Sequence, residues 1–386
     1  MNLRDYLTPG EWTRFREFSV DKETPFLMID LKKVKKNYID FKRNFEQADM
    51  YYAVKASPSV EVLSVLDEQG SCFDIASVYE LDRLLGLGVD PDRISYGNTI
   101  KKIKEISYAY SKGVRLFATD SEADLENLIK YAPGSKIYIR LLVEGAMSAD
   151  WPLARKFGCS MDEVKRLISL AKAQGVIIYG VSFHVGSQQR NILVWQYALM
   201  KVWDIFEWAM DNEDVELEMI NMGGGFPSDY FHLTEDMDVY AEHINRFLDE
   251  YFGDKMPKII IEPGRSLAGN TGVLVTEIVL ISQKNQFEPF QWVYQDAGMF
   301  NGLIETMGEA IKYPIYTEKK GEKGEYILAG PTCDSMDILY QDFKYEFPLS
   351  LEIGDRLYWL STGAYTSSYC SVEFNGFPPM KTYFID

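Results

Sequence analysis

The sequence predicts an α/β chain with two parts, a (β/α)₈ TIM barrel and a C-terminal all-β domain. The length of 386 residues suits about two domains at roughly 150 residues each. Between residues 50 and 262, eight short apolar segments alternate with helical patterns, which is typical of parallel βαβ units closed into a barrel. After residue 265 the helical patterns give way to short β-rich segments separated by Gly, Pro and Asp. These segments predict the β domain.

The barrel region begins with a strand and a helix. An apolar run, Phe26 to Ile29, predicts the strand, and apolar residues from Leu31 to Phe45 then recur every three or four positions, which predicts an amphipathic helix. The eight expected barrel strands are 50–55, 71–75, 93–96, 114–118, 136–142, 176–183, 217–222 and 258–262. Two helix starts are also indicated, one by Pro58 in the first helical position and one by the capping pattern from Ser77 to Glu80.

We expect residues 31–270 to form the barrel, and residues 1–30 together with 271–386 to form the β domain. The expected strands of the β domain are 273–281, 291–295, 325–328, 356–360 and 380–385, with an exposed turn at 318–325. A doubly wound open sheet is the alternative to the barrel. The sequence lacks both GxGxxG and GxxxxGK[ST], the glycine patterns that such a sheet commonly uses to bind nucleotides.

Composition and charge exclude several classes of protein. The formal net charge is −18, which disfavours binding to nucleic acid and to anionic membranes. The sequence shows neither an apolar run of about 20 residues nor a signal peptide. Its three histidines lack metal-ligand spacing, and its four cysteines form no CxxC pair. We therefore expect a cytoplasmic protein that has no structural metal and no disulfide framework.

Polar side chains stand where the expected barrel strands end, which is the face where such barrels carry their active sites. Lys55 closes a buried strand, so it is either a solvated lysine at the barrel mouth or a nucleophilic amine. Glycines after the seventh strand leave backbone N–H groups able to approach an anion. The residues that we expect to meet at this rim are Lys55, Asp74, Arg140, His184, Ser187, Gly223, Gly224, Gly225, Glu262 and Arg265.

Six short motifs carry a resemblance to a known family. They are YYAVKAS, SFHVGS, GGGFP, EPGR, GPTCDSMD and GAYT, and they occur in this order. Together they resemble the fold-type III pyridoxal-phosphate decarboxylases, the group that includes ornithine and diaminopimelate decarboxylases. The resemblance runs from about residue 24 to the C-terminus and implies a (β/α)₈ barrel with a β domain. It also implies pyridoxal 5′-phosphate as the cofactor and a homodimer with shared active sites.

The resemblance assigns roles to residues at matching positions. Lys55 would hold the cofactor covalently, His184 would stack on its ring, and Glu262 would bind the ring nitrogen. Asp74 would lie near the lysine, and Arg140 near the other edge of the ring. From the partner subunit, Cys333 would protonate the α-carbon of the substrate and Asp334 would contact its distal amine. The residues expected to bind the cofactor's phosphate are Ser187, Gly224, Gly225, Arg265 and Tyr365.

The substrate implied by the resemblance is a basic amino acid. GPTCDSMD carries Asp334 after the cysteine, as the ornithine type does, and the stretch from Asp296 to Glu309 has carboxylates and no arginine. Glu309 lies near the position of a pocket carboxylate in ornithine enzymes, so we expect it to bind substrate. The expected reaction is the decarboxylation of L-ornithine to putrescine, a step of polyamine biosynthesis.

Several alternatives remain open at this point. A decarboxylase of broader lysine/ornithine specificity and a diaminopimelate decarboxylase belong to the same group. A racemase on the same fold would need a tyrosine base from the β domain of its partner. A non-catalytic regulatory homologue would be expected to lose Lys55, Cys333 or Asp334, all of which are present. A barrel unrelated to this cofactor is the fourth alternative.

Overall fold

The computed structural model describes residues 2–144, 148–152, 155–371 and 380–386. Contacts divide the chain into two compact units. The barrel unit comprises residues 35–227 and 235–265, and the β unit comprises residues 1–34, 228–234 and 266–386. Among the described residues, none of the helices combines the length and apolar character that crossing a membrane requires.

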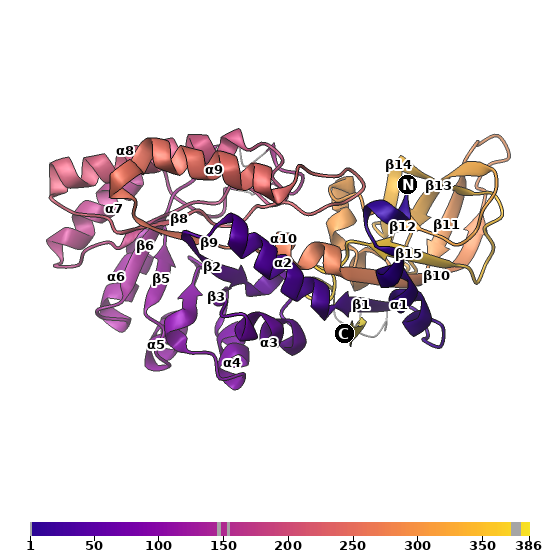
Figure 1. Cartoon of the computed structure of the whole chain (residues 1–386), viewed down its shortest axis with the longest axis horizontal. Helices are drawn as coiled ribbons and strands as arrows, with labels where there is room; N and C mark the ends of the chain where they lie inside the picture. The colour runs from indigo at the N-terminus through magenta and orange to yellow at the C-terminus, as the bar shows by residue number, and fades with distance from the viewer. Residues whose placement is uncertain (1, 145–147, 153–154, 372–379) are drawn as a thin grey trace. The chain divides into compact units, whose positions relative to one another are not determined.

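The barrel unit contains a closed ring of parallel strands, joined in the order β2 to β9, with helices on its outside (Figure 1). The strands are β2 (Ala48–Ala53), β3 (Cys72–Ile75), β4 (Ile94–Tyr96), β5 (Leu116–Thr119), β6 (Lys136–Arg140), β7 (Gly180–Ser182), β8 (Met219–Asn221) and β9 (Lys258–Ile261). The helices are α2 (Leu31–Asn44), α3 (Val60–Glu68), α4 (Val78–Gly86), α5 (Ile103–Ser111), α6 (Glu122–Tyr131), α7 (Met161–Ala173), α8 (Leu193–Glu213), α9 (Met237–Phe252) and α10 (Arg265–Ala268). The TIM-barrel prediction is confirmed.

The interior of the barrel is a packed core rather than a channel. Side chains from alternating positions of several strands meet there, including Tyr51, Leu116, Tyr138 and Met219. The hydroxyl groups of Tyr138 and Ser95 lie 2.9 Å apart and satisfy each other inside this core. Polar side chains at the ends of these strands are therefore held in fixed relative positions, because the packed strands cannot shift independently.

Two expected barrel elements differ in detail from the structure. The sixth expected strand, β7 in the structure, covers only residues 180–182 of the expected 176–183, because the Val176 N–H bonds to the Ala171 carbonyl at the end of α7. Helix α3 begins at Val60 with Ser59 as its N-cap, so Pro58 precedes the helix instead of occupying its first turn. The start of α4 is as expected, with the Ser77 side chain accepting the Glu80 N–H.

The β unit contains a sheet whose main path runs β12-β15-β10-β11-β13-β14, with β1 joining β10 to β16. Its strands are β1 (Phe26–Asp30), β10 (Gly272–Ser282), β11 (Gln291–Gln295), β12 (Ile315–Tyr316), β13 (Lys323–Ala329), β14 (Ile338–Pro348), β15 (Arg356–Leu360) and β16 (Lys381–Ile385). The sequence did not indicate β14, β12 or the helix α1 (Pro9–Ser19). The core of the unit joins Phe15 of α1 to Met28 of β1, Val273 of β10 and Tyr358 of β15.

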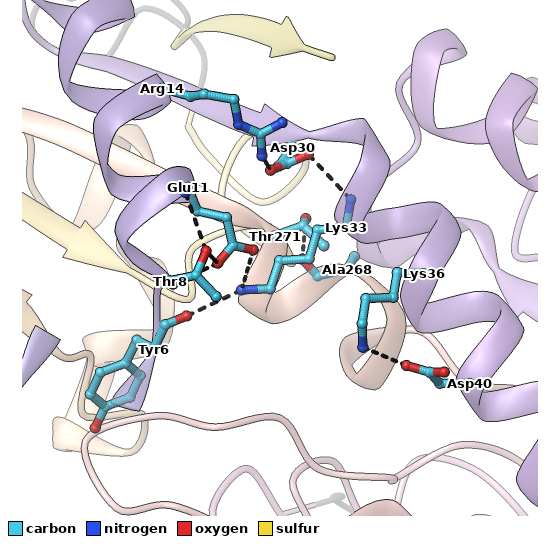
Figure 2. A network of polar contacts seen from close by, with 10 residues as sticks. All are labelled: Tyr6, Thr8, Glu11, Arg14, Asp30, Lys33, Lys36, Asp40, Ala268 and Thr271. Carbon is cyan, nitrogen blue, oxygen red and sulfur yellow. Dashed lines mark hydrogen bonds and ion pairs between the residues drawn. The ribbon is translucent and has the colours of Figure 1, made fainter. Parts of the chain in front are cut away.

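A polar network fastens the N-terminal segment to the rest of the β unit (Figure 2). Thr8 and Glu11 form a capping box at the start of α1. Lys33 lies 3.4 Å from Glu11 and donates a hydrogen bond to the Tyr6 carbonyl. Arg14 pairs with Asp30, whose side chain is almost completely buried. The end of β1 is therefore anchored by charge as well as by its place in the sheet.

Candidate active site

The carboxyl rim of the barrel brings together charged groups that are far apart in the sequence. Asp74 lies on β3, and Arg140 is the last residue of β6. His184 follows β7, and Glu262 follows β9. Lys55 lies in a 3₁₀ turn, Val54–Ala56, directly after β2, and its side chain is exposed. The lysine therefore lies two residues beyond the end of β2 instead of closing the strand, and it is reachable from solvent.

Asp74 is the most strongly perturbed carboxylate of the rim. Burial, and then the neighbouring Glu262 carboxylate, raise its pKa well above the ordinary value, while Lys55 and Arg140 act in the opposite direction. Its Oδ1 atom is buried without a hydrogen-bond partner among the described residues. A Cβ atom on Gly97 would stand 2.1 Å from that oxygen, so a larger residue at position 97 would force the Asp74 side chain to move.

His184 is neutral, and its tautomer follows from its contacts. Burial, and then the charges of Arg140 and Lys55, lower its pKa well below the ordinary value. Its Nδ1 atom accepts the backbone N–H of Gly186 at 3.0 Å. The ring proton is therefore on Nε2, and the imidazole is an uncharged aromatic surface at the rim.

The turn after β8 is built for close backbone approach. Gly223 and Gly225 have φ values of 64° and 100°, which glycine adopts readily. A Cβ atom on Gly224 would lie 2.6 Å from the Glu262 carbonyl oxygen and 3.3 Å from His184 Nε2. Among the described residues, the backbone N–H groups of Gly224 and Gly225 donate no backbone hydrogen bond. Such N–H groups could bind an anion.

Ser187 and Arg265 complete the polar groups of this rim. The side chain of Arg265 is 3% exposed, and its Nε atom donates to Ser187 Oγ at 3.1 Å. The guanidinium and the hydroxyl are thus brought together, as the sequence predicts. A buried arginine beside a serine and a glycine turn could hold a phosphate group.

Two side chains of the rim had no role in the sequence analysis. Asn221, at the end of β8, donates from Nδ2 to Glu262 Oε1 at 2.5 Å and accepts the Gly223 N–H at 2.9 Å. Glu80 bonds to the Ala76 N–H, and its pKa is raised by burial, with Lys55 acting against that effect. Asn221 lies two residues before the GGGFP motif, and this proximity was the available signal. Glu80 had been interpreted only as a helix cap.

The remaining predicted residues belong to the β unit. Cys333 is exposed, and Asp334 accepts the Met336 N–H through Oδ1 at 2.9 Å. Tyr365 has a φ of 57°, a left-handed conformation that is uncommon for tyrosine. A pocket with a volume of about 440 Å³ is lined by Asp334, Trp292 and other residues of the same unit.

The carboxylate of Glu309 binds backbone amides within the β unit. Its carboxylate accepts three consecutive backbone N–H groups, from Gln341 at 2.6 Å, Asp342 at 2.7 Å and Phe343 at 2.8 Å. These amides lie where the pairing of β13 with β14 shifts register. Both carboxylate oxygens hold this bulge in place, which is a structural role that the sequence did not indicate, and the contact of Glu309 with substrate stays a prediction.

The loop that carries Cys333 and Asp334 is organised by Asp337, which the sequence analysis did not single out. Asp337 is 2% exposed and accepts the N–H of Met299 at 2.7 Å, the N–H of Thr332 at 3.0 Å and the Thr332 hydroxyl at 2.6 Å. Its backbone N–H also bonds to the Asp334 carbonyl. The residue closes the 330–337 loop on itself.

Comparison with known proteins identifies the family. Residues 31–269 match the model for the pyridoxal-binding domain of pyridoxal-dependent decarboxylases. The chain belongs to this family. The lysine/ornithine decarboxylase of Selenomonas ruminantium is 34% identical over 355 residues, which cover 92% of this chain and 88% of the relative.

Solved structures of decarboxylases share the complete fold. A lysine/ornithine decarboxylase from Vibrio vulnificus, complexed with putrescine, superposes with a TM-score of 0.88 at 27% identity, covering 98% of this chain and 99% of the other. The arginine decarboxylase of Paramecium bursaria Chlorella virus, bound to agmatine, has a TM-score of 0.87 at 26% identity, covering 96% and 100%. Two other similar chains were solved with PLP.

The rim of this decarboxylase fits its cofactor, pyridoxal 5′-phosphate. The Gly224 and Gly225 N–H groups, Ser187 and Arg265 match a phosphate group, and the neutral His184 ring offers a face for an aromatic ring. The amine of Lys55 is exposed and can react with an aldehyde. The donor set therefore agrees with the cofactor that defines the family.

Proposed function

We propose that this decarboxylase converts L-ornithine to putrescine, a step of polyamine biosynthesis, with lysine as a weaker substrate. The observation that carries the choice is a carboxylate, Asp334, beside the exposed Cys333 in a loop fastened by Asp337. The stretch 296–309 contains no arginine or lysine that could bind a distal carboxylate. A terminal ammonium suits this environment, and a second carboxylate group does not.

Each group of the rim has a defined task in this proposal. Lys55 binds the cofactor covalently, and Ser187, Arg265 and the N–H groups of Gly224 and Gly225 bind its phosphate. When bound, pyridoxal phosphate supplies an electron sink for the bond that breaks as carbon dioxide leaves. Glu262, oriented by Asn221, keeps a proton on the ring nitrogen.

Other residues set the surroundings of the reacting carbon. The uncharged His184 packs against the ring face, and Arg140 lies toward its other edge. Asp74, whose pKa is raised mainly by burial, holds its proton more tightly than an ordinary aspartate and faces the amine of Lys55. The thiol of Cys333 donates a proton to the α-carbon after carbon dioxide has left.

We propose further that the protein is a homodimer with shared sites, in which Cys333 and Asp334 from the β domain of one subunit complete the barrel site of the other, and that Tyr365 helps to bind the phosphate. In this arrangement, residues 31–270 form the cofactor-binding barrel, and residues 1–30 and 271–386 form the β domain. None of the four cysteines, all in the described part of the chain, forms a disulfide. Reduced thiols support a cytoplasmic location.

The substrate is tested by comparing four amino acids in separate assays. Purified enzyme with added cofactor is given ornithine, lysine, arginine or meso-diaminopimelate, and both carbon dioxide and amine product are measured. Ornithine should exceed diaminopimelate by orders of magnitude in kcat/KM, because an unpaired buried charge costs several kcal/mol and about 1.4 kcal/mol is tenfold. Lysine differs by one methylene, worth about 1–3 kcal/mol. A better rate with lysine, arginine or diaminopimelate would reject ornithine as the preferred substrate.

The shared site is tested by mixing two inactive enzymes. Lys55→Ala and Cys333→Ala subunits are combined under conditions that exchange subunits. Half of the dimers should be mixed, each with one intact site, so about a quarter of the sites recover if mixing is random. The Lys55→Ala protein mixed with itself is the control. Absence of recovery after demonstrated exchange would place Cys333 in the site of its own subunit.

A further inference from the structure

Two loops of the barrel unit are joined by backbone hydrogen bonds at Ser187. Trp151, in the loop after β6, forms an antiparallel bridge with Ser187, which follows β7. The Trp151 N–H donates to the Ser187 carbonyl, and the Ser187 N–H donates to the Trp151 carbonyl, both at 3.1 Å. The backbone of Ser187 is therefore held through both its N–H and its carbonyl, which fixes the position of its Cβ atom, while the contact with Arg265 Nε orients its hydroxyl.

The same two loops share an ion pair and a second backbone contact. Arg190 Nε lies 2.8 Å from Asp150 Oδ2, with side-chain exposures of 31% and 33%. The Asp150 N–H donates to the Gln188 carbonyl at 3.2 Å. Gln188 has a φ of 60°, which costs a residue other than glycine backbone energy. These contacts hold the turn in that conformation.

Gln189 lies at the centre of this arrangement and is completely buried. Its backbone N–H donates to the Gly225 carbonyl at 2.9 Å, which joins the Ser187 turn to the glycine turn. Its side-chain Nε2 donates to the Val185 carbonyl at 2.8 Å and to Ser148 Oγ at 3.2 Å. One residue thus contacts both halves of the anion site and the 148–152 segment.

We infer that Gln189 is a positioning residue for the phosphate site, and that the Asp150–Arg190 ion pair holds the 148–152 segment against Ser187 so that this site is formed before ligand binds. Neither role involves contact with the cofactor. Both act through the backbone of Ser187 and Gly225, whose polar groups must face one phosphate. The inference rests on the proposed assignment of Ser187, Gly224, Gly225 and Arg265 to phosphate.

A preformed site binds phosphate more tightly because less ordering remains to be done on binding. Breaking this ion pair, whose side chains are about one-third exposed, should therefore weaken affinity modestly, by about two- to fivefold in Kd for PLP. Removing the buried amide should weaken it by more than about tenfold, because two backbone regions lose their common partner. Affinity for pyridoxal, which lacks the phosphate, should change by less than twofold in either case.

The experiment titrates cofactor-free enzyme with PLP and, separately, with pyridoxal, and follows tryptophan fluorescence and absorbance. The variants are Asp150→Asn, Arg190→Met, Gln189→Met and the reversed pair Asp150→Arg with Arg190→Asp. Glu122→Gln is the matched control, because it breaks an ion pair with Arg166 between the outer helices α6 and α7. The reversed pair should recover most of the affinity lost by the single variants.

The outcomes separate this inference from the proposed function. Wild-type affinity for PLP in both single ion-pair variants, or equal losses for PLP and pyridoxal, would overturn the positioning role. The same loss in Glu122→Gln would also overturn it, since the effect would then not be local. If the wild-type enzyme itself bound PLP no better than pyridoxal, the phosphate assignment would fail instead. Gln189→Met is compared only if its thermal midpoint without cofactor matches the wild type.

Discussion

The replacement Asp337→Asn should destabilise the enzyme and lower its activity together. In the wild type one carboxylate oxygen accepts the Met299 N–H, and the other accepts both the N–H and the hydroxyl of Thr332. An asparagine keeps one acceptor and presents an NH₂ group at the other position. Whichever way the amide turns, at least one buried N–H donor faces another donor.

The expected magnitude follows from that count. A hydrogen bond to a charged group is worth about 1.5–3 kcal/mol, and a buried donor left unsatisfied costs about 1–3 kcal/mol. Some relaxation is expected, so we predict a loss of about 2–4 kcal/mol in the free energy of unfolding. The loop that holds Cys333 and Asp334 would shift, and kcat/KM for ornithine should fall by about ten- to a hundredfold.

The assay is urea unfolding of both proteins at one protein concentration, because dissociation of an oligomer makes apparent stability depend on concentration. Steady-state kinetics are measured at saturating cofactor. Asp342→Asn is the matched control, since that aspartate is exposed in the neighbouring strand. Equal stability and equal kcat/KM for wild type and Asp337→Asn would refute the reasoning, and a change as large in the control would show that the effect is not specific.

Three further predictions concern the barrel. Glu262→Gln should reduce kcat far more than cofactor content, measured by absorbance, because a neutral amide cannot hold a proton on the ring nitrogen; full turnover would remove that role. The pKa of His184 is lowered, so its contribution to stability is present above about pH 6.5 and lost as the pH falls. Below pH 6.5, the free energy of unfolding of the cofactor-free enzyme should fall by up to about 1.4 kcal/mol per pH unit more than that of His184→Asn. Parallel plots of unfolding free energy against pH for the two proteins would contradict this. Lys101→Met should lower the free energy of unfolding in urea by about 3–5 kcal/mol, because it leaves the Asp124 carboxylate without the buried ammonium 2.8 Å away. A loss below about 1 kcal/mol would show that the Asp124 carboxylate does not depend on this buried partner.

The sequence was most informative where a periodic pattern had a single structural solution. Apolar segments bounded by helical patterns located each barrel strand, because strands covered on both sides are uniformly apolar. The rim residues followed, since they come directly after those strands. The long strand β14 was missed although Asp342, Lys344 and Glu346 alternate with Phe343, Tyr345 and Phe347, the pattern of a half-buried strand. We predicted strands from continuous apolar segments, which such a strand does not contain.

Side-chain roles were harder to predict than side-chain locations. Nothing in the sequence around Glu309 shows that its carboxylate would bind the amides of a bulge in a strand some 30 residues further along. Likewise, Asn221 carries no signal of its own, because its function is to accept the Gly223 N–H while donating to Glu262. Hydrogen bonds between residues distant in sequence depend on the fold, and local patterns do not encode them.

The place of β1 in its sheet has a consequence for synthesis of the chain. β1 pairs with β10 on one side and with β16 on the other, where Phe26 lies opposite Lys381, 355 positions later (381 − 26). At about 5–20 residues per second, a ribosome needs roughly 20 to 70 seconds to make the intervening chain. The barrel can form during that interval, while the five buried residues of β1 stay without their final neighbour. The edge of β1 that faces β16 therefore stays unpaired in the nascent chain until residues 381–385 have been synthesised, while the opposite edge can already pair with β10.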